Sequence, residues 1–179
     1  MPSYALFDDL VVARTDAATS GWINFTDLQA VFDFAHSQDR PLFFRPGIYD
    51  SGTVTILPSN GGGKPLQARA MPGSVVLRFN GMDHFLVIDG QARVRFEGLS
   101  FDGQNRALSD YVSGRPAFIV VANGAKDVAF EDCRILYSPG IGVYVTDAEA
   151  AFGGPIWKAI PSASGARTAG STCVPVPWP

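Results

Sequence analysis

The sequence predicts an all-β fold in which short β-strands coil and stack on one another. Three observations support this prediction: a motif that occurs twice, apolar residues that alternate within each copy, and turn-forming residues at matching positions. The first copy spans residues 85–101 and the second spans residues 119–135, so that Gly90 aligns with Gly124. A repeat at a fixed period indicates one structural unit stacked on itself.

Each copy of the motif contains two short alternating segments. Their apolar positions are Val94, Phe96, Leu99 and Phe101 in the first copy, and Val128, Phe130, Cys133 and Ile135 in the second. Alternation of this kind is typical of β-strands. A two-residue gap, Glu97-Gly98 or Glu131-Asp132, lets the chain bend between the segments and keeps the next apolar side chain inward.

A third strand precedes each pair of segments, at residues 85–88 and 119–122. It ends in Asp89-Gly90 or Asn123-Gly124, residue types that tolerate a tight turn. Three strands and three corners therefore make one coil, and stacked coils bury a continuous apolar core. An ordinary antiparallel sandwich with two hairpins that are similar by chance is the alternative.

Less regular coils are predicted upstream of the two copies. Alternating segments separated by Pro and Gly turns occur at residues 42–44, 54–56, 66–70 and 75–79, and residues 141–145 would open a further coil. The Cys133 side chain occupies a core position, which predicts a buried free thiol. We therefore expect the coiled domain to cover residues 1–151.

One amphipathic helix is predicted at about residues 26–37. Thr26 is the expected N-cap, with Gln29 completing a capping box. The apolar stripe consists of Leu28, Val31, Phe32 and Ala35. Because the first coil leaves an unpaired strand edge and an open core, we expect this helix to cover both.

Composition limits the classes of partner. Charged residues make up 17% of the chain, the net charge is −3, and Lys and Arg do not cluster, which argues against nucleic acid. No apolar run is long enough to span a membrane, and the first residues lack the features of a signal peptide.

Residues 152–179 are rich in Pro and small residues and are predicted to form an irregular, disordered tail. The C-terminal edge after Val145 then has no evident cap. This edge leaves three interpretations open: the chain is a fragment, it is a frame-disrupted product, or it forms a homo-oligomer through the open edge.

The stretch from Asp27 to Tyr49, with its helix followed by Pro46-Gly-Ile-Tyr49, resembles the opening of proteins of the pectin-lyase-like superfamily. The paired Val-x-Phe-x-x-Leu-x-Phe segments resemble the repeats of the same superfamily. Within it, the chain is most similar to the N-terminal portion of uncharacterised repeat proteins that carry a twin-arginine signal, although that signal is missing here. The resemblance implies a right-handed parallel β-helix, a periplasmic or secreted location, and a polysaccharide ligand.

The long connection between the two copies, residues 102–116, is the predicted functional loop. Its candidate catalytic residues are Asp102, Arg106 and Arg115, and its candidate substrate-binding residues are Asp110 and Tyr111, with Tyr137 in the neighbouring corner. Arg and Asp suit the hydroxyls and carboxylates of acidic sugars, and Tyr offers a flat face to a sugar ring. A solvated surface loop is the alternative interpretation.

The repeat also places Glu97 above Glu131, with Asp132 alongside. Three carboxylates at one position could hold Ca²⁺, which resembles the use of calcium by pectate lyases. Alternatively, one carboxylate has a raised pKa and acts as an acid, or the two glutamates simply extend into water. The same offset pairs Arg93 with Asp127 at the surface.

The sequence therefore predicts a carbohydrate-binding or polysaccharide-processing protein. If it is an enzyme, we expect elimination or hydrolysis of an acidic polysaccharide, in the manner of a polysaccharide lyase or glycoside hydrolase. A non-catalytic structural or adhesive protein, such as a tailspike or surface repeat protein, and a truncated inactive fragment are the alternatives.

Overall fold

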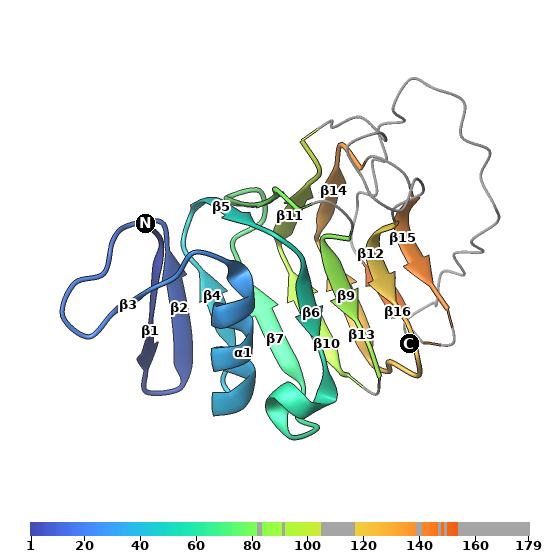
Figure 1. The fold of residues 1–179 in the computed structure, drawn as a ribbon, viewed down its shortest axis with the longest axis horizontal. Coiled ribbons are helices and arrows are strands. Elements are labelled where there is room, and N and C mark those ends of the chain that lie inside the picture. Colours follow the sequence, from blue (N-terminus) through green and yellow to red (C-terminus); the bar gives the residue numbers. More distant parts are fainter. Residues whose placement is uncertain are drawn as a thin grey trace.

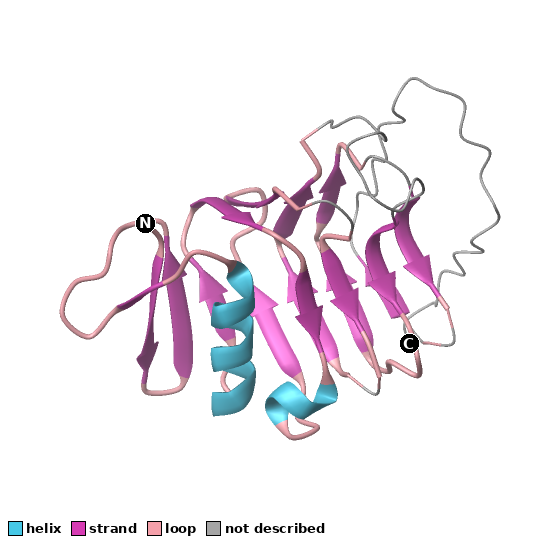
Figure 2. Cartoon of the chain, in the orientation of Figure 1, coloured by secondary structure: helices cyan, strands magenta, loops and turns pink. Residues whose placement is uncertain are grey.

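The computed structural model describes residues 1–81, 84–90, 92–104, 117–138, 141–146, 148 and 150–153. Within these residues the chain is dominated by β-strands, with one α-helix and one short 3₁₀-helix (Figure 2). The strands form three sheets, here called sheets A, B and C. The all-β class predicted from the alternating segments is confirmed.

Sheet A contains β1 (Ser3–Phe7), β2 (Leu10–Arg14), β3 (Ile23–Asn24), β4 (Leu42–Phe44), β7 (Leu66–Arg69), β10 (Val94–Glu97), β13 (Val128–Glu131) and β16 (Ala150–Gly153). Sheet B contains β5 (Gly47–Ser51), β8 (Val75–Phe79), β11 (Leu99–Asp102) and β14 (Arg134–Leu136). Sheet C contains β6 (Val54–Ile56), β9 (Leu86–Ile88), β12 (Ala117–Val121) and β15 (Ile141–Val145). The helices are α1 (Leu28–Gln38) and η1 (Pro58–Gly61).

Successive strands rotate among the three sheets. β4, β5 and β6 lie in sheets A, B and C, and the same order recurs for β7–β9, β10–β12 and β13–β15. We call each set of three a triplet. Every strand of one triplet pairs in parallel with its equivalent in the next triplet. The triplets succeed one another along the long axis of the molecule (Figure 1).

The two copies of the motif lie directly beside each other. Phe96 pairs with Phe130 in sheet A, and Phe101 pairs with Ile135 in sheet B. The rings of Phe96 and Phe130 are stacked with their centroids 5.2 Å apart. All eight apolar positions of the repeat are buried in one core, as the alternation predicts. Cys133 is among them and carries a free thiol, as predicted, and burial raises its pKa to about 11.

The bend inside each copy uses a backbone with positive φ. Gly98 has φ 72° and Asp132, at the equivalent position, has φ 50°. A Cβ at Gly98 would lie only 2.2 Å from the carbonyl oxygen of Ala70, which belongs to the preceding triplet. Gly98 is therefore required by a close approach of two backbones as well as by its φ angle.

We predict that Gly98→Ala lowers the free energy of unfolding by more than about 3 kcal/mol, because it combines left-handed strain with a backbone clash. Gly124→Ala is the matched control, since Gly124 has φ 84° and no heavy atom lies within 4 Å of the position that a Cβ would take. It should cost only about 1–2 kcal/mol. Urea unfolding of both variants would measure this, and equal losses would contradict the proposed clash.

The N-terminal end of sheet A is closed by strands that the sequence did not predict. β1 pairs with β2 and β3 in antiparallel fashion, and β2 pairs with β4 in parallel. The buried Tyr49 of β5 ties this region together, because its hydroxyl donates to the carbonyls of Ala13 (3.0 Å) and Arg45 (2.8 Å). The edge of β4 is thus covered by β2, whereas α1 was expected to cover it.

The helix α1 begins one residue later than predicted. Asp27, rather than Thr26, is the N-cap, and its carboxylate accepts a hydrogen bond from the backbone N–H of Ala30. The predicted apolar stripe is buried, and Phe32 contacts the rings of Phe44 and Phe96. The helix therefore covers the core at the N-terminal end, as expected.

The predicted capping box does not form, because the side chain of Gln29 has another role. Its amide oxygen accepts from the backbone N–H of Thr55 (2.6 Å), and its amide nitrogen donates to the carbonyl of Thr55 (2.8 Å). Thr55 lies on β6, the edge strand of sheet C. One side chain thus satisfies both backbone groups that a neighbouring strand would otherwise bind.

We expect Gln29→Ala to destabilise the protein by about 1–3 kcal/mol, because both backbone groups of Thr55 lose their partner in a half-buried position. Gln38→Ala, at an exposed position near the end of the same helix, should change stability by less than about 0.5 kcal/mol. Thermal unfolding of the two variants tests this, and a Gln29 variant as stable as the Gln38 variant would contradict it.

The predicted tail boundary is wrong by at least two residues. Phe152 and Gly153 lie in β16. Phe152 pairs with Phe130, so β16 adds a parallel strand to sheet A next to β13 of the fourth triplet. The segment Ala150–Gly153 contains a single large apolar residue, so its sequence shows no apolar alternation that would have indicated a strand. The rest of the predicted tail, residues 154–179, lies outside the described residues. No helix among the described residues has the length and apolar character needed to cross a bilayer.

Candidate functional site

Four of the predicted site residues lie outside the described residues. They are Arg106, Asp110, Tyr111 and Arg115, all in the connection between β11 and β12. The structure describes the other five: Asp102 lies on sheet B, Glu97 and Glu131 lie on sheet A, and Asp132 and Tyr137 lie in the corners that follow β13 and β14.

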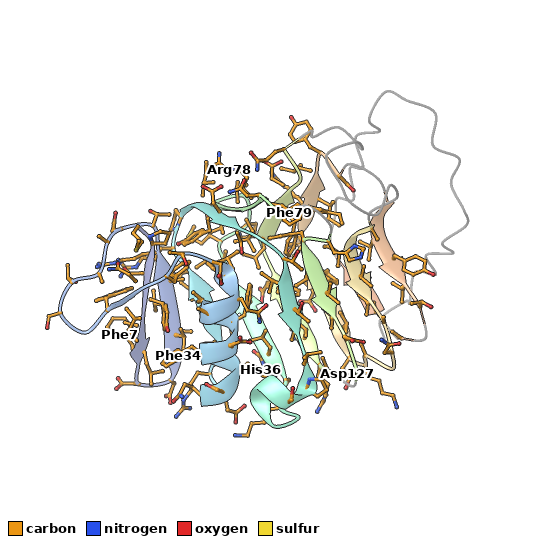
Figure 3. All side chains as sticks on the ribbon, viewed as in Figure 1. Phe7, Phe34, His36, Arg78, Phe79 and Asp127 are labelled. Atoms are coloured by element: carbon orange, nitrogen blue, oxygen red, sulfur yellow. The ribbon has the colours of Figure 1, made fainter. Side chains whose placement is uncertain are left out.

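Asp102 belongs to a row of charged side chains across sheet B. It lies at the end of β11, in register with Arg78 on β8, which in turn is in register with Asp50 on β5. We call Asp50, Arg78 and Asp102 the polar row. The preceding residue of each strand is buried, so that the row lies on the outer face of the sheet. Figure 3 shows Arg78 toward the outside, while the neighbouring Phe79 lies toward the core.

The polar row is held by a bidentate ion pair. Arg78 Nε and Nη2 donate to the two carboxylate oxygens of Asp50 at 2.5 and 2.7 Å. The hydrogen bond to Arg78 lowers the pKa of the Asp50 carboxyl. The same bond and the negative charges of Asp50 and Asp102 raise the pKa of Arg78. Both partners keep substantial exposure, 38% for Arg78 and 46% for Asp50, which leaves them accessible to a ligand.

Two amide side chains fix the start of the predicted functional loop beside this row. Asp102 Oδ1 accepts from the backbone N–H of Gln104 at 2.8 Å, and Gln104 has φ 59°. Gln104 Nε2 donates to the carbonyl of Phe79 (2.6 Å) and to Oδ1 of Asn80 (2.5 Å). The first residues of the loop are therefore anchored to the neighbouring triplet.

Tyr137 lies on the other side of Asp102. It follows β14 directly, has φ 51°, and is 45% exposed. Leu136, the residue before it, is in register with Asp102, and its carbonyl accepts from the N–H of Gly103. The structure thus brings Asp102 and Tyr137 to neighbouring strand ends, as the sequence predicted.

The predicted carboxylate cluster lies along sheet A, whereas the polar row lies on sheet B. Glu97 and Glu131 are in register on β10 and β13, as predicted. Glu131 is bound by Arg95, whose Nη2 donates to it at 2.5 Å. Among the described residues, no group of three or more His, Cys, Asp or Glu side chains is arranged to hold a metal ion. Calcium binding by Glu97, Glu131 and Asp132 stays a prediction.

Asp50, Arg78, Asn80 and Gln104 were not predicted from the sequence. A usable signal existed for the first two, because Asp50 and Arg78 follow an apolar residue at the same place in their strands as Asp102 does in β11. A residue that faces outward in one triplet predicts that the residue in register with it faces outward in the next triplet. The predicted surface pair of Arg93 and Asp127 is confirmed, with 2.9 Å between Nε and Oδ2.

No protein-family profile matches the sequence, and no curated protein or solved structure was found to match the chain.

The lowered pKa of Asp50 predicts a stability contribution that depends on pH. The contribution is present above the ordinary carboxyl pKa of 3.8 and is lost as the pH falls through the lower pKa of the folded state. Because the pair is partly exposed, we expect less than about 1 kcal/mol.

Urea unfolding between about pH 6 and about pH 2 would measure this contribution. Asp50→Asn should lose less stability on acidification than the unchanged protein. Asp9→Asn, which removes the carboxylate of the exposed Arg40 pair, is the control. Parallel acid profiles for the unchanged protein and Asp50→Asn would contradict the prediction.

Proposed function

We propose that the chain is an N-terminal part of a right-handed parallel β-helix and that it binds polysaccharide on the outer face of sheet B. The architecture is supported by the rotation of successive strands among three sheets and by their parallel register. Because a fold does not by itself define a function, the binding proposal depends on the polar row.

The polar row carries the proposal because its donors and acceptors are fixed before a ligand arrives. Asp50 and Arg78 hold each other, and Gln104 holds Asn80 and the start of the loop. Ordered side chains lose less conformational entropy on binding. Neighbouring strands are about 4.8 Å apart, so the row offers polar groups at regular intervals, as an extended polymer of hydroxylated units requires.

The residues beside the row extend the proposed site. Tyr137 offers an exposed aromatic ring to the apolar face of a sugar. If the site is catalytic, Asp102 is the described residue that would act as a base, and Arg106 and Arg115 would supply positive charge for an acidic sugar. Elimination and hydrolysis of an acidic polysaccharide are the two reactions that this set would suit.

A specific observation favours a structural role as the second candidate. The ion pairs Asp50–Arg78, Arg93–Asp127 and Arg95–Glu131 each join strands or corners of successive triplets. Charges that satisfy one another between triplets stabilise the stack without any ligand. In a non-catalytic structural or adhesive protein, this stabilisation would be the whole function of the three ion pairs.

Binding of polygalacturonate and alginate, with and without calcium, tests the proposal. We expect the full chain to bind at least one of these polymers, and Arg78→Ala to weaken binding at least about tenfold through the loss of charged hydrogen bonds. Arg93→Ala is the matched control, because Arg93 also pairs with an aspartate of another triplet but is not part of the polar row. Affinity electrophoresis gives both comparisons.

The outcome separates the two candidates. If the folded protein binds no polyanionic or neutral polysaccharide, the binding proposal is wrong and the structural role is favoured. If both arginine variants lose binding equally, the site does not lie at the polar row. Dependence on calcium that Glu131→Gln abolishes would support the metal prediction for sheet A.

A further inference from the structure

The corner that follows β12 is a tight turn formed by Asn123 and Gly124. Both residues have positive φ, 53° and 84°, and the N–H of Ala125 donates to the carbonyl of Ala122 at 3.2 Å. These values match a type I′ turn. The Asn123 side chain is exposed, and no heavy atom lies within 4 Å of the position that a Cβ of Gly124 would take. Among the described residues, the N–H of Gly124 has no hydrogen-bond partner.

An asparagine that precedes a glycine can lose ammonia without an enzyme. The backbone nitrogen of the glycine attacks Cγ of the asparagine, the bond between Cγ and Nδ2 breaks, and ammonia leaves with the proton of the backbone N–H. Water then opens the cyclic imide at either carbonyl, which yields aspartate or isoaspartate. Glycine favours the attack because it has no Cβ to obstruct the approach. The net reaction exchanges ammonia for water and adds one negative charge at neutral pH.

The sequence contains three asparagine–glycine pairs: Asn60-Gly61, Asn80-Gly81 and Asn123-Gly124. The side chain of Asn60 is not among those that the structure describes. The other two pairs share the same local chemistry, so that any difference in their reactivity must come from the fold.

The fold holds Asn80 and its glycine in place. Asn80 Oδ1 accepts from Gln104 at 2.5 Å, and the Asn80 side chain also hydrogen-bonds the Asp50 carboxylate. Gly81 lies against the core, because a Cβ there would be 2.4 Å from the ring of Phe79. The rotation that brings the glycine nitrogen to Cγ would have to break these bonds and displace packed atoms. The turn at Asn123 is free of such packing, so it reaches the reactive geometry at a lower cost.

The amide of Asn123 also joins two triplets. Its Nδ2 donates to Oδ1 of Asp89 at 2.6 Å, and the same oxygen accepts from the backbone N–H of Gly90 at 2.8 Å. Asp89 follows β9 of the second triplet, and Asn123 follows β12 of the third, so the bond links equivalent corners. A carboxylate at position 123 has no proton to donate, and its charge would repel that of Asp89.

We propose that Asn123 is a site of spontaneous deamidation, and that its conversion breaks the link between the corners of the second and third triplets. The modification needs only water as a co-reactant. It is favoured by the open turn and by the unpaired N–H of Gly124. The inference is independent of carbohydrate binding, because it depends on the corners beside sheet C and not on the polar row.

Incubation of the full chain at mildly alkaline pH, with and without urea, tests the proposal, with peptide mapping by mass spectrometry as the readout. In the folded protein, Asn123 should convert at least about tenfold faster than Asn80, which is the matched internal control. In urea the two rates should be similar, because both asparagines precede glycine. Equal rates in the folded protein, or a difference of the same size that persists in urea, would overturn the proposal.

A second measurement tests the effect on the link to Asp89. Anion-exchange chromatography should separate the deamidated chain from the unchanged one by its added charge. The deamidated chain should have a Tm about 2–4 °C lower, because it loses one hydrogen bond and gains a repulsion. Asn123→Asp should lower the Tm in the same way. A deamidated chain and an Asn123→Asp variant that both keep the Tm of the unchanged protein would overturn the proposed role of the amide.

Discussion

Parallel backbone pairing in register is the constraint on which the rest of the structure depends. Because Phe96 and Phe130 occupy the same position in adjacent strands, every outward or inward choice made in one triplet is repeated in the next. A shift of one residue in the pairing of a strand would turn its core side chains toward the solvent and bury its charged side chains. The core and the polar row are thus two consequences of one register.

The two ends of the stack face different physical problems. At the N-terminal end, antiparallel strands, a helix and the Gln29 side chain together satisfy edges that sheets A and C would leave open. These are three different devices for one requirement, namely that backbone groups removed from water must find partners. Their variety explains why this region lacks the regular period of the later triplets.

The sequence predicted the regular part of the fold well because alternation and turn chemistry recur together there. The strands from β6 to β15 largely follow the predicted segments, and the buried set Val94, Phe96, Leu99 and Phe101 is as expected. β1, β2 and β5 were missed because they pair outside the repeated pattern or begin within a Pro-Gly turn. The N-cap was assigned to Thr26 because both Thr26 and Asp27 satisfy the local rule, whereas in the structure Asp27 accepts the capping hydrogen bond from Ala30. For the site, Asp102 and Tyr137 were found from the loop position, whereas Arg78 required knowledge of the cross-strand register.

The amide of Gln29 has a consequence for how such a chain can vary in length. The Gln29 side chain takes the place of a neighbouring strand at β6. The two ends of sheet C therefore differ, because a side chain closes the β6 end and a further strand could add only at the β15 end. Another triplet added at the β15 end would leave the N-terminal end unchanged, because each triplet contacts only its immediate neighbours. Architectures of this type can therefore lengthen by duplication in one direction while the starting segment stays constant.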